Sequence, residues 1–325
     1  MSGLSFIRRI LFTIVFHYPP IRNSYSHNRQ LQKISFCPIV LLLSVLLFFL
    51  SGCHSDQIHP AIVRSILSSH TFSVTARPSL TIHNDSGSVT LRTGKDHAVV
   101  VTATQHVTDF NTFSTPTYQS TSDTKDMQVN YAQQGNTISV EALNISNAAL
   151  RAIGVDFDVV VPVGSDVQIY AGYGSIDADG LHGRTALESQ NGDITVHNIN
   201  GPMTINGANG SMSVDTIRGT LSLTLDNGSV ELRHVALTGS SQITTERGSI
   251  DFNGSINPHG SYRFRTETGA IDLTLPISSS FDLDAVTKHG SIENEFGSTH
   301  VGNEKGPHAL LRVSSRLGSI SLHRR

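Results

Sequence analysis

From residue 174 onward, apolar and polar positions follow a repeating pattern marked by the tripeptide Gly-Ser-Ile or a close variant. The eight copies begin at Gly174, Gly192, Gly210, Gly228, Gly248, Gly269, Gly290 and Gly318. Successive copies lie 18, 18, 18, 20, 21, 21 and 28 residues apart. A period of this length predicts a solenoid, in which each repeat forms one coil stacked on the previous coil.

Within a repeat, apolar residues alternate with polar ones. In the second repeat they are Ile194, Val196, Ile199, Met203 and Ile205, which follow Gly192 by two, four, seven, eleven and thirteen positions. Alternation predicts strands with one buried face, and a second glycine nine positions after the first separates two strands per coil. The Asn-Gly pairs 191–192, 209–210 and 227–228 place two residue types that tolerate positive φ at one corner.

Stacking of these coils predicts a continuous buried column, with neighbouring coils about 4.8 Å apart. Its expected members are Ile176, Ile194, Met212, Val230, Ile250, Ile271, Ile292 and Ile320, in that order. Each buried side chain of this size contributes roughly 1.5–3 kcal/mol. The predicted fold class is therefore all-β, a single-chain β-solenoid of roughly eight coils over residues 171–325.

Residues 73–170 are rich in β-branched residues but lack the clean period. We expect them to form an irregular N-terminal β-section that caps the stack, because solenoids need atypical terminal coils. Gly87-Ser88-Val89 resembles an early, degenerate copy of the tripeptide, and residues 109–126 are expected to form an exposed loop. Residues 300–307 are expected to be an insertion on one face of the final coil.

The first 52 residues contain five cationic residues and no acidic one, followed by an apolar run over 38–50 and then Leu50-Ser51-Gly52-Cys53. This pattern predicts a secretory signal peptide over residues 1–52, since the run is too short to span a membrane. A cysteine directly after Leu-Ser-Gly resembles a bacterial lipoprotein signal, which implies cleavage before Cys53 and acylation of its sulfur. Residues 53–72 are expected to be a tether.

Cysteine and charge counts narrow the function classes. The other cysteine, Cys37, lies in the predicted signal, so a thiolate metal site is excluded. After residue 52 the chain carries 18 Lys and Arg against 26 Asp and Glu, a formal charge of −8. No basic stripe is present, so we expect no nucleic-acid partner.

The strand Val159-Val160-Val161-Pro162, followed by Tyr173-Gly174-Ser175-Ile176 and Asn191-Gly192-Asp193-Ile194, resembles the bacterial putative-adhesin family of β-strand-repeat proteins. The head GIN domain and auto-transporter-adhesin-like proteins are similar. The resemblance covers about residues 73–325. It implies a secreted or membrane-anchored β-helical domain of uncharacterised function, and it implies no catalytic residues and no cofactor.

One pattern goes beyond packing. Three positions after the repeat glycine, the later coils carry Glu231, Asp251, Asp272 and Glu293. If these coils stack in sequence order, four carboxylates line one outer edge, where oxygen ligands suit Ca²⁺. The alternative, which we favour, is a solvated acidic face.

Paired carboxylates also serve as acid and base in glycosidases, and pectin-degrading enzymes use β-helices. The candidate pairs are Asp251 with Asp272 and Asp177 with Asp179. The sixteen histidines form no ladder at repeat positions and are interpreted as polar surface residues, and no Gly-x-Ser-x-Gly motif is present.

The sequence therefore favours a lipid-anchored, non-catalytic, adhesin-like binding or scaffold module of the bacterial cell envelope. Its partners would be the membrane, through the lipid, and an unknown protein or glycan. His54 and Ser55 do not resemble an aspartate signal for inner-membrane retention, so the outer membrane is favoured. The alternatives are a carbohydrate-active β-helix enzyme, a polysaccharide lyase or hydrolase, and an envelope-stress or assembly accessory protein.

Overall fold

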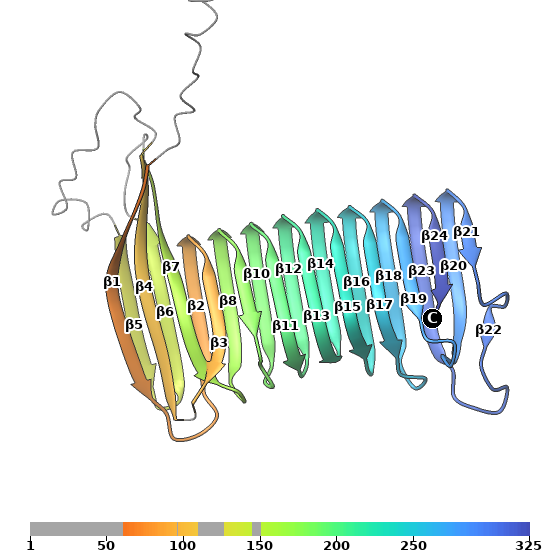
Figure 1. Cartoon of the computed structure of the whole chain (residues 1–325), viewed down its shortest axis with the longest axis horizontal. Helices are drawn as coiled ribbons and strands as arrows, with labels where there is room; N and C mark the ends of the chain where they lie inside the picture. Colours follow the sequence, from red (N-terminus) through yellow and green to blue (C-terminus); the bar gives the residue numbers. More distant parts are fainter. Residues whose placement is uncertain (1–60, 96, 110–126, 145–150) are drawn as a thin grey trace, which may run out of the picture. The chain divides into compact units, whose positions relative to one another are not determined.

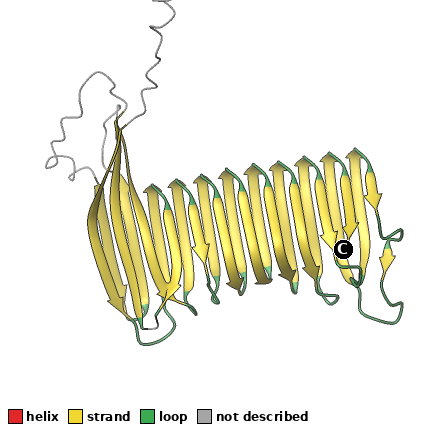
Figure 2. Ribbon diagram, in the orientation of Figure 1, coloured by secondary structure: helices red, strands yellow, loops and turns green. Residues whose placement is uncertain are grey.

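The computed structural model describes residues 61–95, 97–109, 127–144 and 151–325. These residues form two sheets of twelve strands each and contain no helix (Figures 1 and 2). In this part of the chain, nothing helical has the length and apolar character needed to cross a membrane. The all-β solenoid predicted from the repeats is confirmed.

The two sheets are named here by the order of their hydrogen-bonded strands. Sheet A contains β1 (Ala61–Ser73), β4 (Ala98–Asp109), β7 (Arg151–Pro162), β3 (Val89–Gly94), β9 (Ile176–Asp179), β11 (Ile194–Asn200), β13 (Met212–Gly219), β15 (Val230–Leu237), β17 (Ile250–Ile256), β19 (Ile271–Leu275), β24 (Ile320–Arg324) and β21 (Ile292–Asn294). Sheet B contains β22 (His300–Val301), β20 (Phe281–His289), β23 (Ala309–Leu317), β18 (Ser261–Thr268), β16 (Ser240–Arg247), β14 (Leu221–Asn227), β12 (Met203–Asn209), β10 (Thr185–Asn191), β8 (Asp166–Tyr173), β2 (Ser79–Ser86), β6 (Thr137–Asn144) and β5 (Met127–Gln134).

Each regular coil contributes one strand to sheet B and the next strand to sheet A, and equivalent strands of neighbouring coils pair in parallel. Ile194, for example, lies opposite Ile176 on one side and Met212 on the other. The inward-facing residues of both sheets form one continuous apolar core. Val89 of the early tripeptide copy is also buried and lies opposite Ile176, so this copy is a true coil of the stack.

The repeat glycine is required where sheet B turns into sheet A. Gly210 has a φ of 136°, and a Cβ there would overlap the carbonyl oxygen of Gly192 in the coil before it. Asparagine has a different role at this corner from the one expected, since the asparagines with positive φ do not include Asn191, Asn209 or Asn227. Their side chains form an amide ladder instead: Asn209 Nδ2 donates to Asn191 Oδ1 and Asn227 Nδ2 donates to Asn209 Oδ1, both at 3.1 Å.

A second left-handed position explains the odd spacing of the apolar residues. Val196 and Ile199 are both buried although they are three positions apart, which strict alternation in a strand does not allow. Asn198, between them, has a φ of 55° and turns the chain so that Ile199 faces the core. Thr216 and His234 do the same in the next two coils, with φ values of 58° and 53°.

The last coils do not stack in sequence order. Strands β23 and β24 lie between β18–β19 and β20–β21, so the C-terminal coil is inserted into the stack and the preceding coil lies at its end (Figure 1). Ile320 is buried between Ile271 and Ile292, whereas Ile292 is 44% exposed. The predicted column is therefore wrong in the order of its last two members and in the burial of Ile292.

The other end of the stack is also out of sequence order. Strand β7 pairs antiparallel with β4, β4 pairs antiparallel with β1, and the β2–β3 coil lies between the β6–β7 strands and β8–β9. Although residues 79–94 fall in the section expected to be irregular, they therefore form part of the regular stack. Strand β8 runs across the boundary expected between residues 170 and 171.

Two expected connecting segments differ from the structure. Residues 61–72 of the expected tether form most of β1. This strand pairs with the otherwise unpaired backbone edge of β4, and its Phe72 is buried. The insertion at 300–307 does not lie on a coil face: its strand β22 pairs antiparallel with β20 at the edge of sheet B. The predicted signal, the remainder of the tether and nearly all of the expected 109–126 loop lie outside the described residues.

Candidate functional site

Three of the four predicted carboxylates of the acidic edge lie on neighbouring strands. Asp251 on β17 lies opposite Glu231 on β15 and Asp272 on β19. Glu293 does not continue this row, because Ser321 of the inserted β24 lies between Asp272 and Glu293. The expected ladder of four carboxylates is thus a group of three with one acid set apart.

Electrostatic repulsion is greatest at the middle of this group. Partial burial, followed by the negative charges of Glu231 and Asp272, raises the pKa of the Asp251 carboxyl above its ordinary value, although Arg233 and His323 act in the opposite direction. Glu231 is neutralised in part, since Arg233 on the same strand donates a hydrogen bond to its carboxylate. This arrangement is an exposed acidic face in which Arg233 supplies a counter-charge.

The second predicted carboxylate pair, Asp177 and Asp179, lies two residues apart on β9. Asp177 lies opposite Thr90 and Thr195, and Asp179 accepts a hydrogen bond of 2.8 Å from Asn198 Nδ2. Three strands, β11, β13 and β15, separate β9 from β17, so the two predicted pairs do not form one site. Cys53, the predicted lipid site, lies outside the described residues.

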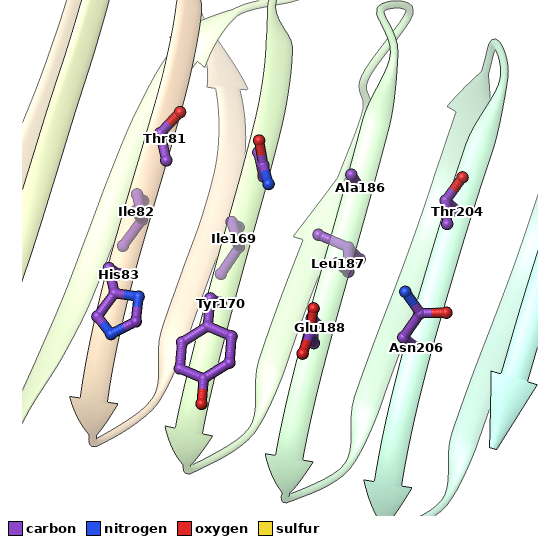
Figure 3. A pocket seen from close by; sticks show the side chains of 11 residues that line it. Thr81, Ile82, His83, Ile169, Tyr170, Ala186, Leu187, Glu188, Thr204 and Asn206 are labelled. Carbon is purple, nitrogen blue, oxygen red and sulfur yellow. The ribbon is translucent and has the colours of Figure 1, made fainter.

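The structure shows a surface that the repeat pattern does not indicate, on the outer face of sheet B. Figure 3 shows His83, Tyr170, Glu188 and Asn206 side by side on β2, β8, β10 and β12. The strand register places these four residues opposite one another in a row that crosses the strands. We call these four residues the sheet B row.

Small side chains leave two shallow hollows on the outer face of sheet B beside this row. A hollow of about 310 Å³ lies over the row and includes Ala186. A second hollow of about 280 Å³ shares Glu188 and Asn206 with it and lies over Ala208. Because a flat sheet face is otherwise covered by side chains, these positions make a shallow groove across β2, β8, β10, β12 and β14.

The groove combines aromatic and polar groups. The rings of His83 and Tyr170 are stacked, with centroids 4.4 Å apart and an interplanar angle of 8°. Gln190 Nε2 donates a hydrogen bond of 3.1 Å to Glu188 Oε1, and His83 Nε2 lies 3.2 Å from Asp85 Oδ1. Glu188 and Asp226 give the groove acidic groups, while none of the described residues that line the two hollows is Lys or Arg.

Sequence reasoning missed this surface for a physical reason. His83 and Tyr170 are 87 positions apart, and both lie in the section without a clear period, so nothing local shows that β2 pairs with β8. The small residues Ala186 and Ala208 can be read from the sequence, but a hollow can be predicted only when their outward-facing neighbours on adjacent strands are known. The one signal in the sequence was that Tyr170 and Glu188 take polar, outward-facing positions in successive strands of the repeat, which places them side by side once the coils stack.

Comparison with known proteins gives a family and distant structural similarity. Residues 155–315 match the family described as Toastrack DUF4097. A comparison with curated protein sequences finds no significant match. A putative adhesin from Bacteroides fragilis is 10% identical with a TM-score of 0.42, and the alignment covers 82% of this chain and 98% of that one.

Two further solved structures are similar at the same level. A putative cell adhesion protein from Clostridium sporogenes is 11% identical with a TM-score of 0.26, covering 80% of this chain and 100% of the other. A putative adhesin from Parabacteroides distasonis is 11% identical with a TM-score of 0.26, covering 81% and 98%.

Proposed function

We propose that the protein, whose residues 155–315 belong to the Toastrack DUF4097 family, is a non-catalytic binding module of the bacterial cell envelope. In this proposal, the groove of sheet B holds an extended, uncharged glycan. The observation that supports this most directly is the sheet B row. It offers an aromatic ring, a carboxylate and an amide in line, which are groups that contact the apolar faces and the hydroxyls of sugars.

The spacing of the row supports a polymer rather than a single small molecule. Neighbouring strands lie about 4.8 Å apart, which is close to the length of one sugar residue in an extended glycan. A chain that runs across the strands therefore meets a new side chain of the row at each sugar. The groove is shallow and open, which suits a polymer that enters from the side.

Charge supports an uncharged ligand. Glu188 and Asp226 line the groove, and the chain after the predicted signal has a formal charge of −8. A polymer of uronic acids would meet like charges there, whereas neutral sugars would donate hydroxyl hydrogen bonds to the same carboxylates. This argues against uronic-acid polymers, the substrates expected for a pectin-degrading β-helix.

The envelope part of the proposal depends on the sequence alone. The segment Leu50-Ser51-Gly52-Cys53, after a basic region and an apolar run, supports lipid attachment at Cys53 and a location at the outer membrane. A lipid-anchored stack would present sheet B to envelope glycans at high local concentration, so even weak contacts per sugar would hold the protein in place.

Co-sedimentation of the full chain in detergent with insoluble chitin and with peptidoglycan sacculi tests the glycan. Tyr170→Ala should reduce binding about five- to tenfold, as expected for loss of one stacking contact of about 1 kcal/mol, and Glu188→Gln should weaken it less. Tyr173→Ala is the matched control, because Tyr173 ends the same strand outside the row and is 67% exposed.

Two results would contradict the proposal. One is equal binding by the Tyr170→Ala and Tyr173→Ala variants, which would place the contact elsewhere. The other is cleavage of polygalacturonate that is lost on Asp272→Asn, which would favour the enzymatic alternative at Asp251 and Asp272.

A further inference from the structure

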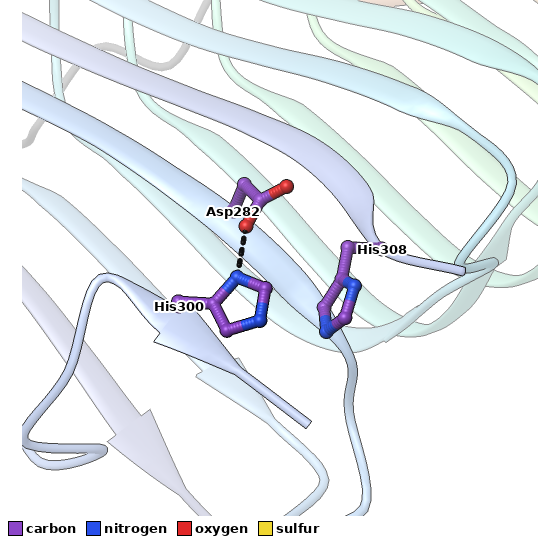
Figure 4. A group of neighbouring side chains, drawn as sticks. All are labelled: Asp282, His300 and His308. Carbon is purple, nitrogen blue, oxygen red and sulfur yellow. Dashed lines mark hydrogen bonds and ion pairs between the residues drawn. The ribbon is translucent and has the colours of Figure 1, made fainter. Parts of the chain in front are cut away.

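A second cluster of chemically active side chains lies at the end of the stack, far along the sheet from the glycan groove. Asp282 belongs to β20, His300 belongs to β22, and His308 comes directly before β23 (Figure 4). The three residues thus come from three separate segments, and two of them lie in or beside the 295–308 segment that connects β21 to β23. This segment is the source of the longest spacing between repeat glycines.

The backbone brings the three side chains together. Asp282 and His300 are direct partners in the antiparallel β20–β22 pair, and cross-strand partners project on the same side of a sheet. On the other side of β20, Ala309 N donates to Ser280 O, and Ser280 Oγ donates a hydrogen bond of 2.8 Å to Pro307 O. These bonds fix the chain on both sides of His308.

The ligand atoms are close enough to share one ion. One potential ligand atom from each of Asp282, His300 and His308 lies within 4.8 Å of the other two. His300 Nδ1 is 2.6 Å from Asp282 Oδ1, and the two imidazole rings lie with centroids 4.1 Å apart, tilted by 36° (Figure 4).

A second observation points to a ligand at this cluster. His308 Nε2 is fully buried and has no hydrogen-bond partner among the described residues. A buried nitrogen without a partner is costly, because it has lost its hydrogen bonds to water. Asp282 does not supply the missing hydrogen bond, because its carboxylate bonds to His300 Nδ1. A bound metal ion would satisfy the nitrogen.

We propose that Asp282, His300 and His308 form a binding site for one divalent transition-metal ion of the Zn²⁺ type. Two imidazoles and one carboxylate match the donors that zinc uses, and water would complete a four-coordinate shell. Ca²⁺ is a poor match because it requires six to eight oxygen ligands. This site revises the interpretation of these histidines as polar surface residues, and it does not depend on the proposed glycan binding.

The site would fasten the 295–308 segment to the edge strand of sheet B. Strand β22 is two residues long and pairs with β20 at residues Phe281 and Asp282. So short a pairing is weak by itself. An ion bound to both β20 and the residues flanking the loop 302–307 would hold this segment in place. It would therefore keep the exposed edge of β20 covered, which prevents pairing with other chains.

Isothermal titration calorimetry of the full chain with ZnCl₂, and in parallel with CaCl₂, tests the site. Histidines elsewhere in the chain are further potential zinc ligands, so the comparison between variants decides. His300→Gln and His308→Gln should each remove one zinc equivalent or weaken it at least tenfold. His234→Gln is the matched control, because His234 forms a similar exposed pair with Asp215, 2.8 Å apart. His197 lies opposite Asp215, but among the described residues these three do not bring their ligand atoms as close together as Asp282, His300 and His308 do.

Limited proteolysis measures protection of the loop itself, which zinc bound elsewhere on the chain would not change. Lys305 is exposed in the loop between His300 and His308. Zinc should slow tryptic cleavage after Lys305 at least severalfold in the unmodified chain and in His234→Gln, and should have no effect in His308→Gln. Circular dichroism checks that each variant retains its β structure, and Asp282→Asn replaces any variant that does not.

The proposal is overturned if zinc binds with equal stoichiometry and affinity to the unmodified chain and to the His300→Gln and His308→Gln variants. It is also overturned if zinc leaves the rate of cleavage after Lys305 unchanged, or if CaCl₂ protects the loop as well as ZnCl₂ does.

Discussion

Asp251 shows how the strand register determines the properties of a single side chain. The sequence predicted correctly that Glu231, Asp251 and Asp272 would share one edge, because each follows its repeat glycine by three positions. The structure adds that Asp251 has a carboxylate on both sides, while Glu231 is bound by Arg233. Partial burial of Asp251, and after it the repulsion from both neighbours, raises the pKa of its carboxyl.

Asp251→Asn should stabilise the protein at pH 7 by roughly 0.5–1 kcal/mol, the repulsion between like charges at strand spacing in water. A raised folded-state pKa means that the folded state binds the proton more tightly than the unfolded state. Stability is therefore highest below the unfolded pKa of about 3.9 and falls as pH rises through the folded pKa. Urea unfolding at pH 7 and pH 3 measures this, and the benefit of Asp251→Asn should be absent at pH 3.

Asp177→Asn is the matched control, because Asp177 occupies the same repeat position but lies between two threonines. It should give no stabilisation at pH 7. Equal stabilisation by both substitutions would show that the repulsion at Asp251 is not specific to its neighbours. If Ca²⁺ bridges the edge, it should raise the melting temperature of the unmodified chain more than that of Asp251→Asn.

At the scale of the coil, much could be predicted because the determinants are local. Ile194 and Val196 are two positions apart, as alternation in a strand requires, but Val196 and Ile199 are three apart. This spacing requires one extra residue in the strand, and Asn198 supplies it in a left-handed conformation. The glycine corners were equally visible. The amide ladder was not, because Asn-Gly pairs are typical of turns with positive φ, and only the stacking of coils shows that Asn209 bonds to Asn191 and Asn227.

The repeat glycine can be tested by adding one methyl group. Gly210→Ala should destabilise the protein by more than about 3 kcal/mol, because it combines an unfavourable φ with overlap on the Gly192 carbonyl. Gly135→Ala is the matched control: its φ is 61° and no atom lies within 4 Å of the added Cβ. It should cost about 1–2 kcal/mol. Chemical denaturation measures both, and equal costs would mean that close stacking of the glycines contributes nothing.

At the scale of the molecule, the order of the end coils could not be predicted from the repeats. Gly290 and Gly318 head the same tripeptide, so the local pattern fits either order. Side-chain burial shows the difference: Leu311 and Val313 of β23 are fully buried, whereas Ile292 of the terminal coil is exposed. The same reasoning applies to the sheet B row, which depends on β2 lying beside β8 although 79 residues separate the two strands.

The inserted C-terminal coil makes truncation informative. In the structure, β20 and β21 pair with β23 and β24 and do not pair with β18 or β19. A chain that ends at residue 308 therefore loses the coil that connects residues 281–294 to the stack. It should unfold at the same denaturant concentration as a chain that ends at residue 276, since both expose the same edge. Trypsin should cleave it rapidly after Lys288, which lies within β20 in the full chain.

Stacking in sequence order leads to the opposite result, which is what makes the comparison decisive. In that arrangement, residues 281–294 would pair directly with β18 and β19, and removal of residues 309–325 would take away only the outermost coil. The chain ending at residue 308 would then be more stable than the chain ending at 276 and would resist cleavage after Lys288. Because adjacent coils contribute stability mainly through their shared interface, the position of the last coil decides how much of the stack survives its removal.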